Sequence, residues 1–132
     1  FSGKTRDEII QNIQSYQSAA KIPMFIGVDE EGGTVNRVST NPNLRAVPFW
    51  SPQELYAEGG FDLIQSDTQE KCELLNSLGI NLNFAPICDV SQNPEEFWTE
   101  RRANCRLCPL SCANHVSRRY GERPKAFPRV RK

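Results

Sequence analysis

The strongest constraint on the fold is a short apolar run that ends in consecutive acids. Residues 22–28, Ile-Pro-Met-Phe-Ile-Gly-Val, are followed at once by residues 29–31, Asp-Glu-Glu. A run that is rich in β-branched residues and too short for a lone helix predicts a strand buried on both faces. Gly32 and Gly33 come next and allow a sharp turn and a close approach to a ligand. Carboxylates at the end of a buried parallel strand are typical of the site of an α/β barrel.

The segments on either side of this strand predict helices. Thr5 and Glu8 fit a capping box, and apolar residues at helical spacing follow, so we expect a helix from about residue 6 to residue 20. Residues 51–54, Ser-Pro-Gln-Glu, predict a second helix start with proline at its first position. Between them, residues 29–50 show no sustained period and predict a loop of about twenty residues, longer than usual and therefore functional.

The second helix leads into a second strand. Gly59 and Gly60 predict a brief break in that helix, and Gly79 suits its C-terminal cap. Residues 80–86, Ile-Asn-Leu-Asn-Phe-Ala-Pro, then predict a strand that ends at the proline. A strand, a long loop, a helix and a strand in this order predict a right-handed βαβ unit with a parallel pair.

Two asparagines interrupt the apolar pattern of the second strand. Asn81 and Asn83 are two residues apart, so their side chains point to one face. Either that face is polar and hydrogen-bonded, as at a barrel interior near a site, or it is a strand edge that faces solvent.

The two strand segments carry a family resemblance. Residues 22–37 resemble the signature of glycoside hydrolase family 3, in the branch of β-N-acetylhexosaminidases. Residues 78–90, Leu-Gly-Ile-Asn-Leu-Asn-Phe-Ala-Pro-Ile-Cys-Asp-Val, resemble the next barrel strand of that family. The resemblance covers residues 1–100. It implies an α/β fold, a fragment of a TIM-type (β/α)8 barrel, followed by a non-native or disordered C-terminal tail.

The resemblance also implies a function. Members of this branch remove terminal β-linked N-acetylglucosamine from glycans or cell-wall fragments, with retention of configuration and without a cofactor. We therefore expect a carbohydrate substrate as the partner, and neither nucleic acid nor a membrane. No apolar run approaches the length of a membrane span. The resemblance is compatible with the bacterial cytoplasm or the cell surface, and it leaves the oligomeric state open. A β-glucosidase of the same family is the enzymatic alternative.

Individual site residues follow from the resemblance as well. It implies that Asp29 holds hydroxyls of the terminal sugar. Arg101 stands where the family carries an arginine that also contacts the sugar, although residues 102–104, Arg-Ala-Asn, depart from the family pattern. The nucleophilic aspartate and the acid/base histidine of the family have no counterpart in this chain. We therefore expect the chain to be an inactive fragment.

The remaining charged residues near the strand ends are expected to be structural. Adjacent residues on one strand end point in different directions, so Glu30 and Glu31 make a poor catalytic pair across a sugar ring. We expect both to fold the loop and Arg37 to pair with these acids. Asp89 is expected to fix the loop after its own strand, with a ligand contact as the alternative.

The charge distribution changes sharply near residue 100. Residues 1–100 hold 6 basic and 15 acidic side chains, whereas residues 101–132 hold 10 basic and 1 acidic. Three of the five cysteines also lie in the second part. A break of this kind marks a boundary, so we divide the chain into a partial barrel domain, residues 1–100, and a basic tail, residues 101–132.

The tail allows two interpretations, of which the first is a zinc site. Cys105, Cys108, Cys112 and His115 are four soft ligands within eleven residues, a plausible zinc set. With the surrounding arginines they would form a small nucleic-acid-binding module.

The second interpretation, which we favour, is a shifted reading frame. Read one nucleotide forward, residues 125–132 permit Lys-His-Phe-Pro-Gly-Tyr-Gly, the next motif of the family, whose lysine and histidine bind the sugar. Residues 103–109 permit Gln-Thr-Ala-Asp-Tyr-Val, a typical start of the intervening family helix. We infer a frameshift near Arg101 or Arg102, with the cysteines and arginines as products of the wrong frame. Such a segment is expected to be disordered.

Overall fold

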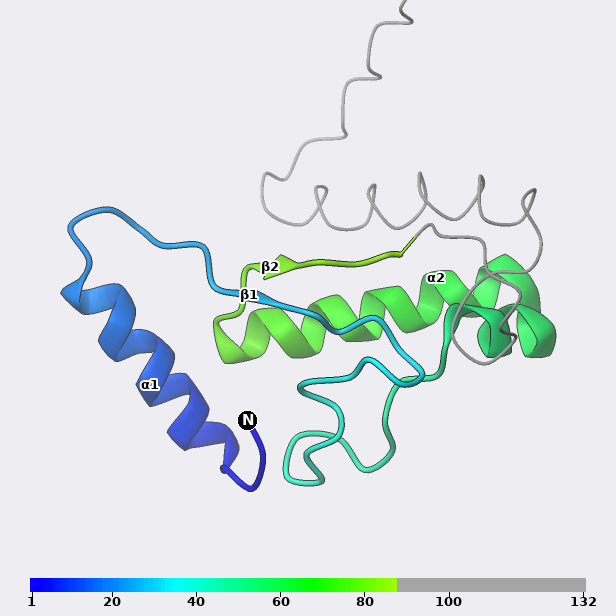
Figure 1. Ribbon diagram of the computed structural model, residues 1–132, viewed down its shortest axis with the longest axis horizontal. Coiled ribbons are helices and arrows are strands. Elements are labelled where there is room, and N and C mark those ends of the chain that lie inside the picture. Colours follow the sequence, from blue (N-terminus) through cyan, green and yellow to red (C-terminus); the bar gives the residue numbers. More distant parts are fainter. Residues whose placement is uncertain (88–132) are drawn as a thin grey trace, which may run out of the picture.

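A computed structural model describes residues 1–87, which form two helices and one pair of short parallel strands (Figure 1). The elements are α1 (Arg6–Ala19), β1 (Gly27–Val28), α2 (Pro52–Leu78) and β2 (Leu82–Asn83). Gly27 pairs with Leu82 and Val28 with Asn83 in a parallel register. The predicted order of strand, long loop, helix and parallel strand is therefore confirmed.

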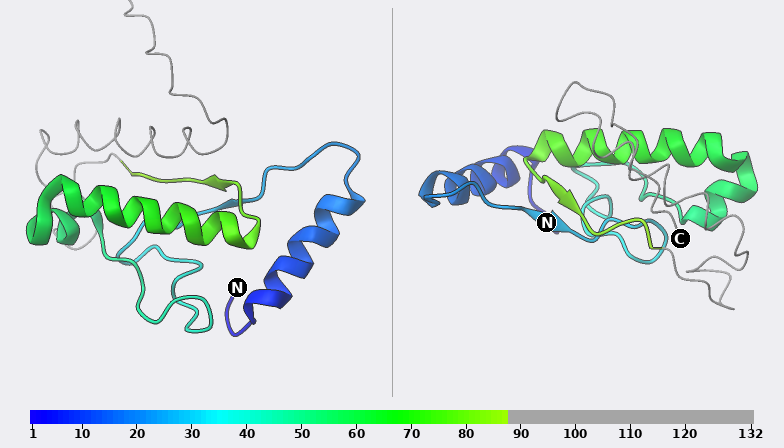
Figure 2. Two further views of the ribbon diagram at one scale, coloured as in Figure 1. Left: turned by 180° about the vertical axis from the view of Figure 1, so that it is seen from behind. Right: turned by 90° about the horizontal axis from the view of Figure 1, so that it is seen from above.

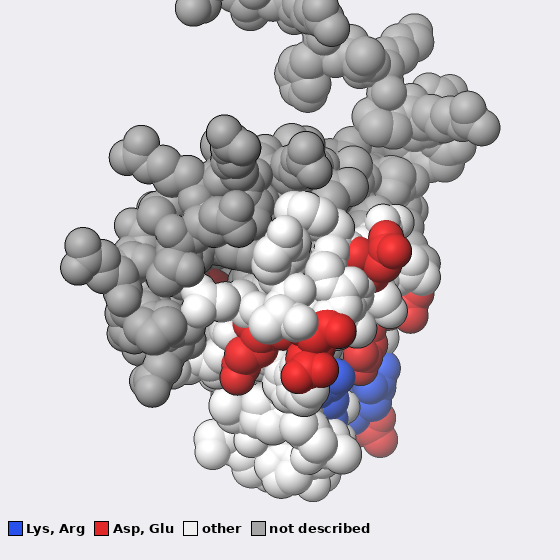
Figure 3. All heavy atoms as spheres, turned by 90° about the vertical axis from the view of Figure 1, so that its right-hand side faces the viewer, with Lys and Arg blue, Asp and Glu red and all other residues white. Residues whose placement is uncertain are grey.

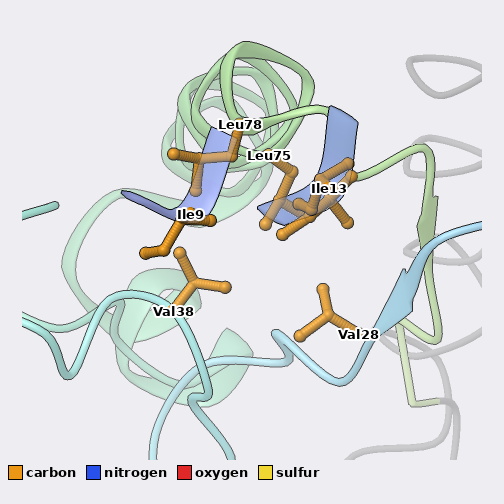
Figure 4. Close-up of a cluster of buried hydrophobic side chains, with 7 residues drawn as sticks. Ile9, Ile13, Val28, Val38, Leu75 and Leu78 are labelled. Atoms are coloured by element: carbon orange, nitrogen blue, oxygen red, sulfur yellow. The ribbon is translucent and has the colours of Figure 1, made fainter. Parts of the chain in front are cut away.

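The long helix α2 runs beside the two strands, and α1 lies against the C-terminal end of α2 (Figure 2). One hydrophobic core joins these elements (Figure 4). Helix α1, β1, the loop after β1, α2 and the residue that leads into β2 all contribute to it. Its buried members are Ile9, Ile13, Val28, Val38, Leu75, Leu78 and Ile80. This core holds the start of the loop after β1 against both helices.

Both helices begin with the predicted capping boxes. The Thr5 hydroxyl accepts a hydrogen bond from the Glu8 N–H at 3.3 Å, and the Glu8 carboxylate accepts one from the Thr5 N–H at 2.7 Å. That backbone hydrogen bond, with the Thr5 hydroxyl, lowers the pKa of Glu8. Ser51 and Glu54 make the same reciprocal pair at 2.7 and 3.3 Å, with proline at the first helical position. These caps satisfy N–H groups that a helix start leaves without partners.

Two glycines shape α2. Gly60 has φ 62° and ψ −149°, so the helix is kinked there as the sequence predicts. Gly79 ends the helix in the left-handed region with φ 88°. A Cβ at Gly79 would lie 2.9 Å from Cγ2 of Ile13, so the absence of a side chain also lets α1 approach. The helix therefore ends where its last turn meets α1.

The prediction that residues 22–28 form a strand buried on both faces is wrong. Only Gly27–Val28 is a strand, and Ile22 and Phe25 are 78% and 77% exposed. A strand of the buried type needs a neighbour on each edge and helices over both faces, and residues 1–87 supply β1 with a single strand neighbour. The Gln17 side chain also bonds the N–H and C=O of Met24 at 3.0 and 2.8 Å, which occupies groups that a longer ladder would use.

The second strand is likewise shorter than predicted. It covers Leu82–Asn83, while Ile80 is buried before it and Phe84 is 56% exposed after it. Residues 1–87 thus form an α/β arrangement with two strands, which is too few to close a barrel. No helix within residues 1–87 is both long and apolar enough to cross a membrane.

Several predictions lie outside the described residues. They are the tail at residues 101–132 with its frameshift and its disorder, and the roles assigned to Asp89, Arg101, Cys105, Cys108, Cys112 and His115.

Candidate functional site

The loop after β1 folds around the side chain of Glu30. This carboxylate is fully buried and accepts three backbone N–H hydrogen bonds. Its Oε2 accepts from Arg37 at 2.8 Å and Val38 at 2.6 Å, and its Oε1 accepts from Ser39 at 3.0 Å. A buried carboxylate is tolerated only with such partners. The structural role predicted for Glu30 is confirmed.

The two asparagines of the second strand segment bond the backbone around β1. The Asn83 amide accepts from the Glu30 N–H at 2.9 Å and donates to the Glu30 C=O at 3.0 Å. The Asn81 amide accepts from the Ile26 N–H at 2.8 Å and donates to the Met24 C=O at 3.0 Å. These amides continue the ladder on both sides of the two paired residues. The face is polar and hydrogen-bonded, as predicted. The alternative of a solvent-facing edge is wrong for Asn83, which is buried, whereas Asn81 is half-buried.

Asp29 lies between these fixed points. The Val28 carbonyl accepts from the Phe84 N–H at 2.9 Å, and both backbone groups of Glu30 are bonded to Asn83. The backbone is therefore held on both sides of Asp29, yet its side chain is exposed. Within residues 1–87 its carboxylate has no hydrogen bond or ion pair. The structure places Asp29 at the strand end, as predicted, and its contact with sugar stays a prediction.

The paired glycines turn the chain next to the start of α2. Gly32 and Gly33 have φ values of 106° and 67°, a conformation that favours glycine. A Cβ on Gly32 would collide with the Trp50 carbonyl oxygen, and one on Gly33 would lie 2.9 Å from Cβ of Ser51. The predicted sharp turn is confirmed. The close approach that these glycines permit is to the backbone before α2.

A buried ion pair on α2 faces the same loop, and sequence reasoning missed it. Lys71 Nζ lies 3.2 Å from Asp67 Oδ2 and donates to the Glu31 carbonyl at 3.1 Å. It also lies 4.9 Å from the centroid of the Phe49 ring. Burial raises the pKa of Asp67, and the neighbouring Lys71 ammonium opposes that rise. The helical spacing of the two residues could have revealed the pair, because both lie on the buried stripe of α2 that begins at Ile64.

A narrow cleft separates the strand ends from α2. Its free volume is about 30 Å³, room for one or two water molecules and far too little for a sugar ring. A ligand of Asp29 would therefore lie outside this cleft. Residues 1–87 hold no group of three His, Cys, Asp or Glu side chains that could bind a metal ion. The described residues that line the cleft are Glu31, Pro52, Leu55, Ile64, Asp67, Thr68, Lys71, Cys72, Asn83, Ala85 and Pro86.

The prediction that Arg37 pairs with the strand-end acids is wrong for its guanidinium. The Arg37 backbone N–H bonds Glu30, but its exposed side chain forms no ion pair with an acid in residues 1–87. Glu30 is saturated by three N–H groups and closed to solvent, so a guanidinium cannot reach it. Glu31 does take part in folding the loop, because its N–H donates to the Val35 carbonyl at 2.9 Å and its C=O accepts from Lys71.

The end of the molecule toward which both strands run is rich in acids. Figure 3 views this end, and red carboxylate side chains outnumber blue ones among the coloured residues.

Comparisons with known proteins agree on one family. Residues 2–103 match the Glycosyl hydrolase family 3 N terminal domain. Beta-hexosaminidase A of Pseudoalteromonas piscicida is 37% identical over 78 residues, which cover 59% of this chain and 13% of that protein. Beta-hexosaminidase of Xanthomonas campestris pv. campestris (strain B100) is 30% identical over 91 residues, 67% of this chain and 27% of that protein. Beta-hexosaminidase LpqI of Mycobacterium tuberculosis is 29% identical over 80 residues, which cover 57% of this chain and 19% of that protein.

This chain therefore spans between 13% and 27% of the length of these relatives. No solved structure matches it significantly. The family match covers both strands and both helices, including the strand end that carries Asp29 and the asparagines that hold it. The chain belongs to glycosyl hydrolase family 3, and its residues 2–103 match the N-terminal domain of that family.

Proposed function

We propose that the domain represented by this chain acts on terminal β-linked N-acetylglucosamine of glycans or cell-wall fragments, and that Asp29 binds hydroxyls of that sugar. The relatives named above are beta-hexosaminidases, which supports the substrate class. The observation that carries the role of Asp29 is its exposed carboxylate on a backbone that hydrogen bonds hold on both sides.

A fixed carboxylate suits sugar hydroxyls. An ionised aspartate has two oxygens that only accept, so it can take two O–H donors of one sugar ring. Hydrogen bonds to a charged group contribute about 1.5–3 kcal/mol each. A side chain on a rigid strand end loses less conformational freedom on binding than one on a mobile loop. Among the acids at this strand end, Asp29 has both an exposed carboxylate and a backbone held by hydrogen bonds on either side.

The proposed reaction proceeds with retention through a glycosyl-enzyme. A carboxylate attacks the anomeric carbon, the leaving-group oxygen takes a proton, and water then releases the sugar. Glu30 cannot be the nucleophile, because its carboxylate is fully buried and holds three N–H groups. In the family the nucleophile and the acid/base residue lie further along the chain. We therefore propose that the 132-residue polypeptide alone does not hydrolyse an aryl N-acetyl-β-glucosaminide, and activity that Asp29→Ala abolishes would contradict this.

Binding can be tested on the chain itself by adding N-acetylglucosamine to the ¹⁵N-labelled polypeptide. We expect saturable amide shifts centred on residues 29–31, and their loss in Asp29→Asn. Asp7→Asn is the matched control, because Asp7 is an exposed acid in the first turn of α1. Shifts that survive Asp29→Asn, or a spectrum that the sugar leaves unchanged, would refute the proposed role of Asp29.

A further inference from the structure

We propose that Lys71, held by Asp67, is a positioning residue that fixes the strand end carrying Asp29. The inference rests on the proposed function, because it concerns the same sugar-binding carboxylate. Lys71 lies on α2, whereas Asp29 follows β1, so the pair would tie the helix to the site.

The ammonium group of Lys71 lies in a buried environment. The Lys71 side chain is 10% exposed and that of Asp67 is 9% exposed. A buried charge is costly, and an apolar side chain at such a position is often as stabilising as an ion pair. Packing alone therefore does not account for a lysine on the buried stripe of α2. The hydrogen bond that its ammonium makes outside the helix does.

That hydrogen bond reaches the strand end that carries Asp29. Lys71 Nζ donates to the Glu31 carbonyl at 3.1 Å, two residues beyond Asp29. The next two residues are the glycines with positive φ, where the chain turns sharply toward the start of α2. Asn83 fixes Glu30, and Lys71 fixes the following peptide. The N–H groups on either side of the Glu31 carbonyl bond Val35 within the same loop, at 2.9 and 3.3 Å, whereas Lys71 ties this peptide to α2. Without Lys71 the backbone that orients Asp29 would lose this anchor to the helix.

Lys71 contacts both ends of the long loop. Its ammonium lies over the Phe49 ring, and the Phe49 carbonyl accepts from the Gly33 N–H at 3.0 Å and from the Asn36 amide at 3.0 Å. Asp67 stands one helical turn before Lys71 and holds the ammonium in this position. The pair thus links the loop start at Glu31 with the loop end at Phe49.

The test uses the full 132-residue chain and three variants. Lys71→Met keeps the length of the side chain and removes its donors. Lys71→Met combined with Asp67→Asn also removes the carboxylate charge that the single variant leaves buried without a partner. Lys21→Met is the matched control, because Lys21 is exposed. Each protein is measured for unfolding in urea, for the ¹³C shift of the Glu31 carbonyl and for N-acetylglucosamine affinity by titration.

If Lys71 positions the strand end, the stability and the sugar affinity of the variants should not change in parallel. Lys71→Met should move the Glu31 carbonyl signal and weaken sugar binding about tenfold, because binding would then have to order a strand end that Lys71 otherwise holds in place. The double variant should regain stability but not affinity. Lys21→Met should match the unaltered chain in all three measurements.

Two results would overturn the proposal. One is a folded Lys71→Met protein with unchanged affinity and an unchanged Glu31 signal. The other is a double variant that regains affinity together with stability, since that would make the pair purely structural. If the unaltered chain binds no sugar, the proposed function fails by itself. The Glu31 carbonyl signal then decides the positioning role, which a shift in Lys71→Met supports and an unchanged signal refutes.

Discussion

The two ends of the first strand segment are held very differently. At its amino end, residues 22–25 are apolar, yet Ile22 and Phe25 are almost fully exposed. At its carboxyl end, Glu30 is fully buried although its side chain is polar. The difference shows that apolar composition did not decide which end is fixed. Directed hydrogen bonds from Asn83 and Lys71 hold the end that carries the candidate site. Nearer the amino end, side-chain amides bond only the backbone of Met24 and Ile26, and the apolar side chains there stay exposed.

The largest loss of stability is expected when the carboxyl end of the segment loses the hydrogen bonds of Glu30. Glu30→Gln replaces one acceptor oxygen with an NH₂ group that faces backbone N–H donors. We expect a loss of about 3 kcal/mol in the free energy of unfolding, because buried donors lose a charged partner. Urea unfolding measures it. Glu58→Gln, at an exposed position, is the control, and equal stability of the two variants would contradict the account.

A smaller effect is expected from the asparagines. Asn83→Ala leaves the Glu30 N–H and C=O without their partner in a buried place, so we expect a loss of about 2 kcal/mol. Asn81 is less buried, and Asn81→Ala should cost about 1 kcal/mol. The order of the two losses, measured by urea unfolding, is the informative result. A larger loss for Asn81→Ala would mean that the strand end is not the better-held part.

The pH dependence of stability sharpens the comparison at Asp67. Burial raises the pKa of this carboxyl in the folded chain. Its contribution to stability is therefore fully present below its unfolded pKa of about 3.9 and is lost as pH rises through the raised pKa. Above pH 4, the unaltered chain should lose free energy of unfolding relative to Asp67→Asn. Urea unfolding of both proteins at several pH values checks this, and a difference that does not vary with pH would show that Asp67 titrates normally.

The smallest effect is expected at the amino end. Phe25→Ser removes an aromatic ring that is 77% exposed, so the free energy of unfolding should change by less than about 0.5 kcal/mol. The same method measures it. A loss as large as that of Asn83→Ala would show that residues 22–25 are packed in solution, and the contrast between the two ends would then disappear.

Local signals in the sequence predicted the local structure well. The capping boxes at Thr5 and Ser51, the kink at Gly60 and the cap at Gly79 depend on residues within one turn of each other. For the same reason the position of Asp29 at a strand end followed from the pattern. The role of Glu30 as a structural carboxylate was also predicted.

Long-range contacts could not be predicted in the same way. The bond from Lys71 to the Glu31 carbonyl joins residues forty positions apart, and no periodicity encodes it. The exposure of Ile22 and Phe25 depends on strand neighbours that residues 1–87 do not supply. The ion pair of Arg37 was predicted from charge alone. In the structure, backbone N–H groups bond both carboxylate oxygens of Glu30 instead.

A chimera tests the sugar-binding role of Asp29 most directly. Residues 2–87 would replace the corresponding segment of the Xanthomonas campestris beta-hexosaminidase, and hydrolysis of an aryl N-acetyl-β-glucosaminide would be compared with that of an aryl β-glucoside. We predict a preference for the former and a loss of about 100-fold or more in kcat/KM for Asp29→Asn, the equivalent of two hydrogen bonds to a charged group. Asp7→Asn should stay within twofold. An Asp29→Asn chimera that keeps its activity would contradict the account.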